Sequence, residues 1–162
     1  MTPIHAGLIA LHTSGGWRGA LIQGPSGCGK SDLALRALSE GFRLVADDRV
    51  LVWRCGDQLY GRAPRTLAGL LEVRGQGIGR FQALDFCRIG LFVTCGPPER
   101  LPEPAFSDHL GLTLPLLTLA PLESSAPSRL RRALQHLGAG TEGAYQALLF
   151  SGDAPRPGGD PR

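Results

Sequence analysis

The sequence is poor in the features that mark nucleic-acid-binding and membrane-spanning proteins. Of its 17 basic residues only Lys30 is a lysine, no lysine- and arginine-rich run occurs, and aromatic residues make up only 6% of the chain. This composition argues against a nucleic-acid partner. No apolar run approaches the ~18 residues that a membrane-spanning helix needs, so we expect no membrane insertion.

The cysteine spacing and the N-terminus argue against a zinc-binding protein and against a secreted one. Cys28, Cys55, Cys87 and Cys95 form no Cys-x-x-Cys pair, and no histidine accompanies them at zinc-binding spacing. The N-terminus lacks a basic region followed by an apolar core, so we expect no signal peptide. Reduced thiols in a cytoplasmic protein are therefore expected. Cys28 is a partial exception, because it lies in an electropositive glycine-rich stretch where a thiol can be reactive; alternatively, that position accepts any small residue.

What remains is the composition of an ordinary globular chain. Its 162 residues are 43% hydrophobic and 19% charged, with a formal net charge of +3. This length suits one domain with a sizeable core. We expect a single domain over residues 1–150 and a disordered tail, rich in proline and glycine, over residues 151–162.

The most informative stretch is residues 24–31, which read GPSGCGKS and match the phosphate-binding P-loop pattern G-x-x-x-x-G-K-[ST]. In such a loop the backbone amides point at phosphate oxygens, the lysine reaches the β- and γ-phosphates, and the serine hydroxyl binds Mg²⁺. A strand is predicted before the loop, at residues 17–23, and a helix after it, at residues 30–39, which places a helix N-terminus at the phosphates. The predicted nucleotide-binding residues are Gly24, Pro25, Ser26, Gly27, Cys28, Gly29, Lys30 and Ser31.

Two adjacent carboxylates, Asp47 and Asp48, follow the predicted strand at residues 42–46. Ligands of α/β sheets bind at the carboxyl ends of strands. Adjacent side chains of an extended chain point in opposite directions, which leaves one carboxylate for Mg²⁺ and the other for an acceptor hydroxyl. A simple Asp-Asp turn is the alternative. Residues 49–54 and 58–62 predict a β-hairpin in place of a second crossover helix.

A second dense region spans residues 70–79. Glu72 and Arg74 share one side of a predicted strand, and three glycines follow within five positions. This composition favours a mobile loop that approaches a ligand. Glu72 is a candidate Mg²⁺ ligand, direct or indirect, and Arg74 a candidate stabiliser of phosphate charge. Further predicted elements are strands at residues 4–11, 88–94 and 114–120, a proline-rich loop at 96–104, and helices at 125–137 and 142–150.

Three of these segments together resemble one family, the HPr kinase/phosphorylases, bacterial enzymes that phosphorylate a serine of the phosphocarrier protein HPr. The segments are residues 24–35, residues 43–50 (RLVADDRV) and residues 71–78 (LEVRGQGI). The resemblance covers about residues 4–138. It implies an α/β fold with a P-loop kinase core similar to HPr kinase and phosphoenolpyruvate carboxykinase, in which a mixed sheet with β-hairpins is flanked by helices.

The resemblance also implies roles for individual residues. Asp48 would take the proton from the serine hydroxyl, and Lys30 would bind the phosphates. The residues implied at the catalytic centre are Asp48, Lys30, His5 and, by a weaker match, Arg100. The implied Mg²⁺ ligands are Ser31, Asp47 and Glu72, and the rest of the signature is Arg74, Gly75 and Gly77.

The implied activity is that of a protein serine kinase that uses ATP and Mg²⁺ and acts on HPr or an HPr-like protein, in the regulation of carbohydrate metabolism by the phosphotransferase system. Phosphorolysis of the phosphoserine by inorganic phosphate is a second implied activity. The chain resembles the short form of the family, without the N-terminal domain of long members, and we expect a homo-oligomer. The residues alone leave two alternatives open: a small-molecule P-loop kinase, and a non-catalytic module that senses ATP or phosphate.

Overall fold

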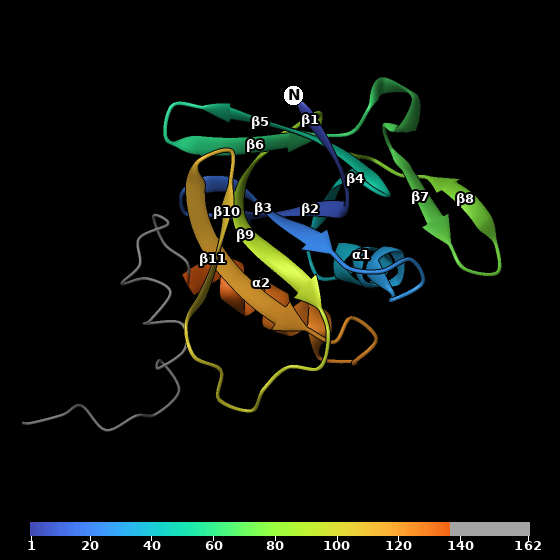
Figure 1. Cartoon of the computed structure of the whole chain (residues 1–162). Helices are drawn as coiled ribbons and strands as arrows, with labels where there is room; N and C mark the ends of the chain where they lie inside the picture. Colours follow the sequence, from blue (N-terminus) through green and yellow to red (C-terminus); the bar gives the residue numbers. More distant parts are fainter. Residues whose placement is uncertain (137–162) are drawn as a thin grey trace, which may run out of the picture.

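The computed structural model describes residues 1–136 of the chain (Figure 1). Its elements, in chain order, are β1 (Thr2–His5), β2 (Gly7–Thr13), β3 (Gly16–Gln23), α1 (Lys30–Leu38), β4 (Arg43–Ala46), β5 (Arg49–Cys55), β6 (Gln58–Arg62), the 3₁₀-helix η1 (Arg65–Leu67), β7 (Leu70–Val73), β8 (Gly77–Arg80), β9 (Cys87–Cys95), β10 (Ala105–His109), β11 (Leu112–Leu119) and α2 (Ala126–His136). The predicted helix at residues 142–150 and the predicted tail at 151–162 lie outside the described residues.

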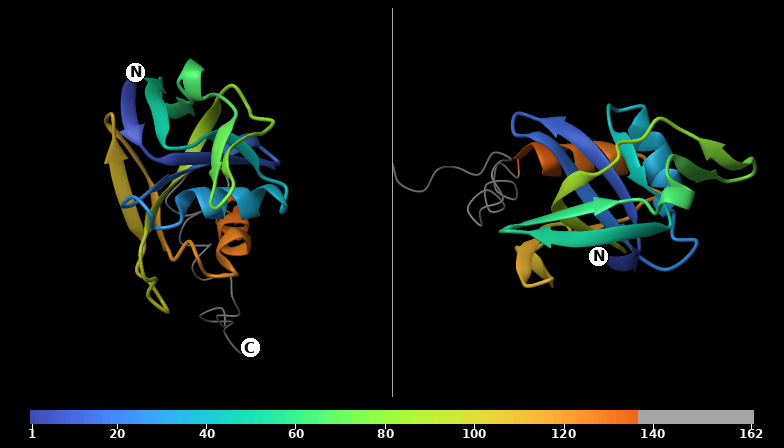
Figure 2. Two further views of the ribbon diagram at one scale, coloured as in Figure 1. Left: turned by 90° about the vertical axis from the view of Figure 1, so that its right-hand side faces the viewer. Right: turned by 90° about the horizontal axis from the view of Figure 1, so that it is seen from above.

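A mixed sheet of nine strands forms the body of the structure. At its centre β3, β9 and β11 run parallel, while β2 is antiparallel to both β3 and β4. The first half of β9 also pairs with β6, which leads through β5 to β1. The sheet therefore curls, and the β5–β6 hairpin lies over one face of the central strands (Figure 2). Strands β7 and β8 form a separate two-stranded sheet that projects beside α1 (Figure 1).

The central strands are buried on both faces because helices cover one face and curled strands the other. Successive side chains of a strand point to opposite faces. Accordingly, Ile9 and Ile22 lie in the core beneath α1 and α2, whereas Leu8 and Leu21 lie in the core closed by β5 and β6. All four are fully buried, and burial of each such side chain contributes about 1.5–3 kcal/mol.

Three predictions of local structure were incomplete or wrong. The strand predicted at residues 4–11 is two strands, because the chain leaves the β1–β5 ladder after His5 and enters the β2–β3 ladder at Gly7. Strand β10 was missed; it forms a hairpin with β11. Residues 75–79 are not an open loop but the turn and second strand of the β7–β8 hairpin, whose glycines Gly75 and Gly77 adopt φ values of 80° and 95°.

Neither α-helix in residues 1–136 has the length and apolar character of a membrane-spanning segment.

Candidate active site

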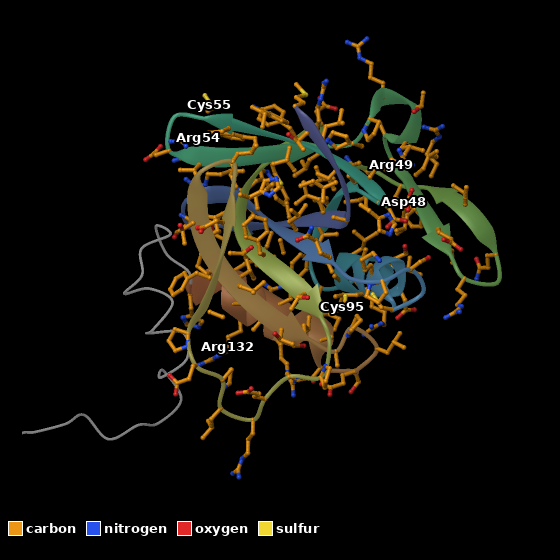
Figure 3. The ribbon with its side chains drawn as sticks, in the orientation of Figure 1. Asp48, Arg49, Arg54, Cys55, Cys95 and Arg132 are labelled. Carbon is orange, nitrogen blue, oxygen red and sulfur yellow. The ribbon has the colours of Figure 1, made fainter. Side chains whose placement is uncertain are left out.

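Four segments meet at one edge of the sheet because of the directions of three strands. Both β3 and β4 run antiparallel to β2, so they end where β2 begins. The loop after β3 (residues 24–31, the glycine loop), the Asp47-Asp48 pair after β4 and His5 before β2 therefore come together. Strand β7 packs against α1 and brings Glu72 to the same place. Figure 3 shows Asp48 at this edge, between the end of β4 and the β7–β8 hairpin.

These segments surround a cavity of about 610 Å³. Most of the predicted site residues line it: His5, Ser26, Gly27, Gly29, Lys30, Ser31, Asp47, Asp48, Glu72, Arg74 and Gly77. The cavity thus brings together predicted site residues as far apart in the sequence as His5 and Gly77.

Other predicted site residues lie elsewhere. Arg100 is exposed in the loop between β9 and β10 and is not among the residues that line the cavity, so its catalytic role stays a prediction. The remaining predicted residues outside the cavity lining are Gly24, Pro25, Cys28 and Gly75. The sequence reading also missed Ile78, which lines the cavity with 73% of its surface exposed. The available signal was an apolar residue flanked by glycines in the LEVRGQGI segment.

The glycine loop turns sharply into α1. Gly27 and Gly29 have φ values of 79° and 105°, in the left-handed region that favours glycine, and Gly29 is the N-cap of the helix. Lys30 is only 8% exposed, and its Nζ donates hydrogen bonds to the carbonyl oxygens of Gly24 (2.8 Å) and Pro25 (3.0 Å). The ammonium group is thus held at the loop by two neutral carbonyl oxygens, without a carboxylate partner among these hydrogen bonds. The first-turn amides of the helix add donors for an anion at the same point.

Asp47 is the buried carboxylate of the site, with 8% of its surface exposed. Ser31 Oγ lies 2.9 Å from Asp47 Oδ1 and 3.0 Å from Oδ2, and the Glu72 backbone amide donates to Oδ2 at 3.2 Å. These hydrogen bonds offset the cost of burying the charge. Glu72 contributes its backbone amide to Asp47, while its own side chain is exposed.

The Ser31 hydroxyl and the Asp47 carboxylate together are a donor set that fits Mg²⁺. Mg²⁺ usually takes one or two carboxylates, completes its shell with phosphate oxygens and waters, and is held in P-loop enzymes by a serine or threonine and an aspartate. In residues 1–136 no group of three or more histidine, cysteine, aspartate or glutamate side chains is arranged to hold a metal ion.

Asp48 is the exposed carboxylate of the site. Its side chain is 61% exposed, and its Oδ1 lies 3.2 Å from His5 Nδ1, while Arg49 Nε is 4.0 Å from Oδ2. Its backbone has a φ of 65°, which is unfavourable for a residue other than glycine by about 1–2 kcal/mol. A hydrogen bond from the Ala6 amide to the Asp48 carbonyl, at 3.2 Å, holds this conformation. Strained residues of this kind concentrate at functional sites.

Fold and site together define a class: a mixed α/β domain with a curled mixed sheet and two helices, in which a glycine loop at a helix N-terminus faces two carboxylates. Residues 2–84 match the family model described as the HPr Serine kinase C-terminal domain. This is more than half of the chain, and the chain belongs to that family. The resemblance seen in the sequence is confirmed. The matched range contains every predicted site residue except Arg100.

Curated relatives and a solved structure agree with this assignment. The HPr kinase/phosphorylase of Exiguobacterium sp. is 47% identical over 79 residues, which are 48% of this chain and 24% of the relative. That of Clostridium tetani is 43% identical over 99 residues, 57% of this chain and 31% of the relative. The chain thus spans about a quarter to a third of the length of these relatives. The Hpr(Ser) kinase/phosphatase structure from Coxiella burnetii superposes with a TM-score of 0.67 at 23% identity, over 82% of this chain and 97% of that one, and shares the fold.

Proposed function

We propose that this chain is a protein serine kinase that transfers the γ-phosphoryl group of ATP to a serine of HPr or an HPr-like protein, with Mg²⁺. The observation that carries the proposal is that the glycine loop with Lys30 and the exposed Asp48 carboxylate line one cavity. The name of the relatives, HPr kinase/phosphorylase, supplies the acceptor. The role that follows is cytoplasmic regulation of carbohydrate metabolism through the phosphotransferase system.

The glycine loop would hold the phosphates of ATP. Lys30 would exchange the carbonyl oxygens of Gly24 and Pro25 for phosphate oxygens, because an ion pair replaces two bonds to neutral acceptors. Ser31 and Asp47 would hold Mg²⁺, which when bound neutralises charge on the phosphates. Since the Ser31 hydroxyl and the Asp47 carboxylate are already hydrogen-bonded to each other, little rearrangement is needed to present both oxygens to a cation.

Asp48 would act on the acceptor. The serine oxygen forms a bond to the γ-phosphorus, the bond between that phosphorus and ADP breaks, and the hydroxyl proton passes to the Asp48 carboxylate. Because the Asp48 side chain is 61% exposed, a serine on the surface of a folded protein can reach it. His5 holds the carboxylate through the 3.2 Å contact between Nδ1 and Oδ1 and is therefore a positioning residue.

The test is a transfer assay with purified chain, labelled ATP, MgCl₂ and purified HPr, followed by mass spectrometry of HPr. We expect one phosphoserine on HPr, and a loss of on the order of 10²–10⁴-fold in rate for Asp48→Asn, the range expected when general-base assistance is removed. Asp57→Asn, an exposed carboxylate in the β5–β6 turn, is the matched control and should keep the wild-type rate.

Two outcomes would contradict the proposal in different ways. Binding of ATP by wild-type protein without transfer to HPr would identify a nucleotide-sensing module. Transfer of the label to a small metabolite, with HPr unlabelled, would identify a small-molecule kinase.

A further inference from the structure

Two cysteines that are distant in the sequence meet behind the glycine loop. Gln23 at the end of β3 pairs with Thr94 in β9, so the residues that follow them, Gly24 and Cys95, lie side by side. The loop then turns back, with the Cys28 amide donating to the Pro25 carbonyl at 3.2 Å. A methyl group built on Gly24 would lie 2.9 Å from Cys28 Sγ and 3.0 Å from Cys95 Sγ. Both sulfur atoms therefore pack against the same Cα atom.

The two thiols differ in nearby charge and in how readily they lose a proton. Lys30 Nζ lies 3.9 Å from Cys28 Sγ, which is partly exposed. Reactive cysteines typically occupy such electropositive, partly exposed positions. Burial and a hydrogen bond with Cys28 raise the pKa of the Cys95 thiol to about 12. Cys28 is thus suited to meet an oxidant first, and Cys95 is held next to it as a neutral thiol.

The other two cysteines are placed differently. Cys87 is only 3% exposed and lies in the core closed by β5 and β6. Cys55 is exposed at the end of β5, and Figure 3 shows it on the opposite side of the molecule from Cys95. The pairing behind the glycine loop is therefore specific to Cys28 and Cys95 within the described part of the chain.

We propose that Cys28 and Cys95 are a site of reversible oxidation, at which a disulfide bond ties the glycine loop to the end of β9 and weakens phosphate binding. The oxidant is a peroxide. The Cys28 sulfur attacks the peroxide O–O bond, giving a sulfenic acid and water; the Cys95 sulfur then displaces the sulfenic oxygen as a second water. Two thiols lose two electrons and two protons in total, and one hydrogen peroxide becomes two waters. A dithiol reductant reverses the reaction by thiol–disulfide exchange.

The effect on phosphate binding follows from disulfide geometry and rests on the proposed function. A disulfide requires the two Cβ atoms to lie about 3.5–4.5 Å apart. The two sulfur atoms are now free thiols and must come within about 2.05 Å of each other to form the bond, which draws residue 28 toward β9, and with it the amides of the loop and the start of α1. A displacement of about 1 Å in a positioning group can cost on the order of a hundredfold. We therefore expect nucleotide affinity to fall at least tenfold, and by linkage a bound nucleotide should slow formation of the disulfide.

The chain allows a clear test by peptide mapping, because trypsin places the four cysteines in four different peptides. Cys28 falls in residues 19–30, Cys95 in 89–100, Cys55 in 55–62 and Cys87 in 81–88. Purified protein is treated with hydrogen peroxide, its remaining thiols are alkylated, and the digest is analysed by mass spectrometry without reduction. We expect residues 19–30 linked to residues 89–100, and loss of the link after dithiothreitol. Alkylation of both peptides after oxidant treatment, with no link between them, would overturn the proposal.

The functional arm compares ATP binding by reduced and oxidised protein. We expect a drop of at least tenfold on oxidation in wild-type protein and in Cys55→Ser, and no drop in Cys95→Ser, which leaves the glycine loop unchanged. A linked protein with unchanged affinity would overturn the regulatory effect. If the reduced protein binds no ATP, the proposed function and the regulatory effect both fail, whereas the oxidation site is judged by the linked peptide alone.

Discussion

The two neighbouring aspartates of the site differ in solvent exposure and in hydrogen-bond partners. Asp47 is 8% exposed and hydrogen-bonded to Ser31, whereas the Asp48 side chain is 61% exposed and contacts His5. Asp48 also departs from the extended conformation of β4, with a left-handed φ of 65°. Under the proposed function, Asp47 would serve the phosphate and metal side of the site, and Asp48 would serve the acceptor.

Replacing Asp47 should affect Mg²⁺ before it affects chemistry. In Asp47→Asn the net negative charge beside Ser31 is lost, and one oxygen that accepts hydrogen bonds becomes a donor. We expect the Mg²⁺ concentration needed for half-maximal ATP binding to rise at least tenfold, in a binding titration at fixed ATP. Asp48→Asn is the matched comparison and should leave this titration unchanged. Equal Mg²⁺ requirements for wild type and Asp47→Asn would remove Asp47 from the metal site.

His5 should influence turnover through Asp48 rather than through stability. Its side chain is 52% exposed, so truncation removes little packing. For His5→Ala we expect kcat to fall about tenfold, of the order expected when a group held by one hydrogen bond is released, with KM for ATP and Tm unchanged. His5→Gln retains a donor and should recover part of kcat. A rise in KM for ATP, or no recovery with glutamine, would contradict a positioning role.

At the scale of elements, the sequence predicted best where one local signal was strong. The glycine loop, α1 and the β5–β6 hairpin were predicted close to their observed bounds, because glycines and apolar periodicity mark them. The β7–β8 hairpin was not: its glycines look like a mobile loop until the pairing of Glu72 with Ile78 is known. Strand β10 was missed because its residues are only partly buried and alternate weakly.

The tight contact between β3 and the start of β9 can be tested by two glycine substitutions. A Cβ atom on Gly19 would lie 2.5 Å from Cys87 Sγ and 3.3 Å from the Arg88 carbonyl oxygen. Since buried sulfur and backbone cannot move away cheaply, we expect Gly19→Ala to lower the free energy of unfolding by about 1–3 kcal/mol. A Cβ atom on Gly7 in β2 meets nothing within 4 Å. Gly7→Ala should therefore be close to wild type in urea unfolding, and equal losses for both variants would contradict this packing.

At the scale of the molecule, the sequence could indicate which residues matter but not how they meet. Asp47, Asp48 and Lys30 were predicted as site residues from motifs, and the structure places all three around one cavity. The position of His5 beside Asp48 depends on β1 pairing with β5 while β2 pairs with β3 and β4. Such non-local pairing leaves no trace in local periodicity, which is also why the approach of Cys95 to the glycine loop was not foreseen.

The closure of the curled sheet over Cys87 should make the whole fold sensitive to alkaline pH. Burial raises the pKa of the Cys87 thiol from 9.0 to about 12. In the unfolded chain this thiol loses its proton above about pH 9, whereas in the folded chain it keeps it, so folding binds a proton in this range and stability falls as pH rises. Each pH unit costs at most about 1.4 kcal/mol. In urea unfolding between pH 8 and about pH 11 we expect the free energy of unfolding to fall less steeply with pH for Cys87→Ala than for wild type. The control is Cys55→Ala, which removes an exposed thiol and should lose stability with pH as wild type does. Equal slopes for wild type and Cys87→Ala would show that the thiol is not enclosed by the curled sheet.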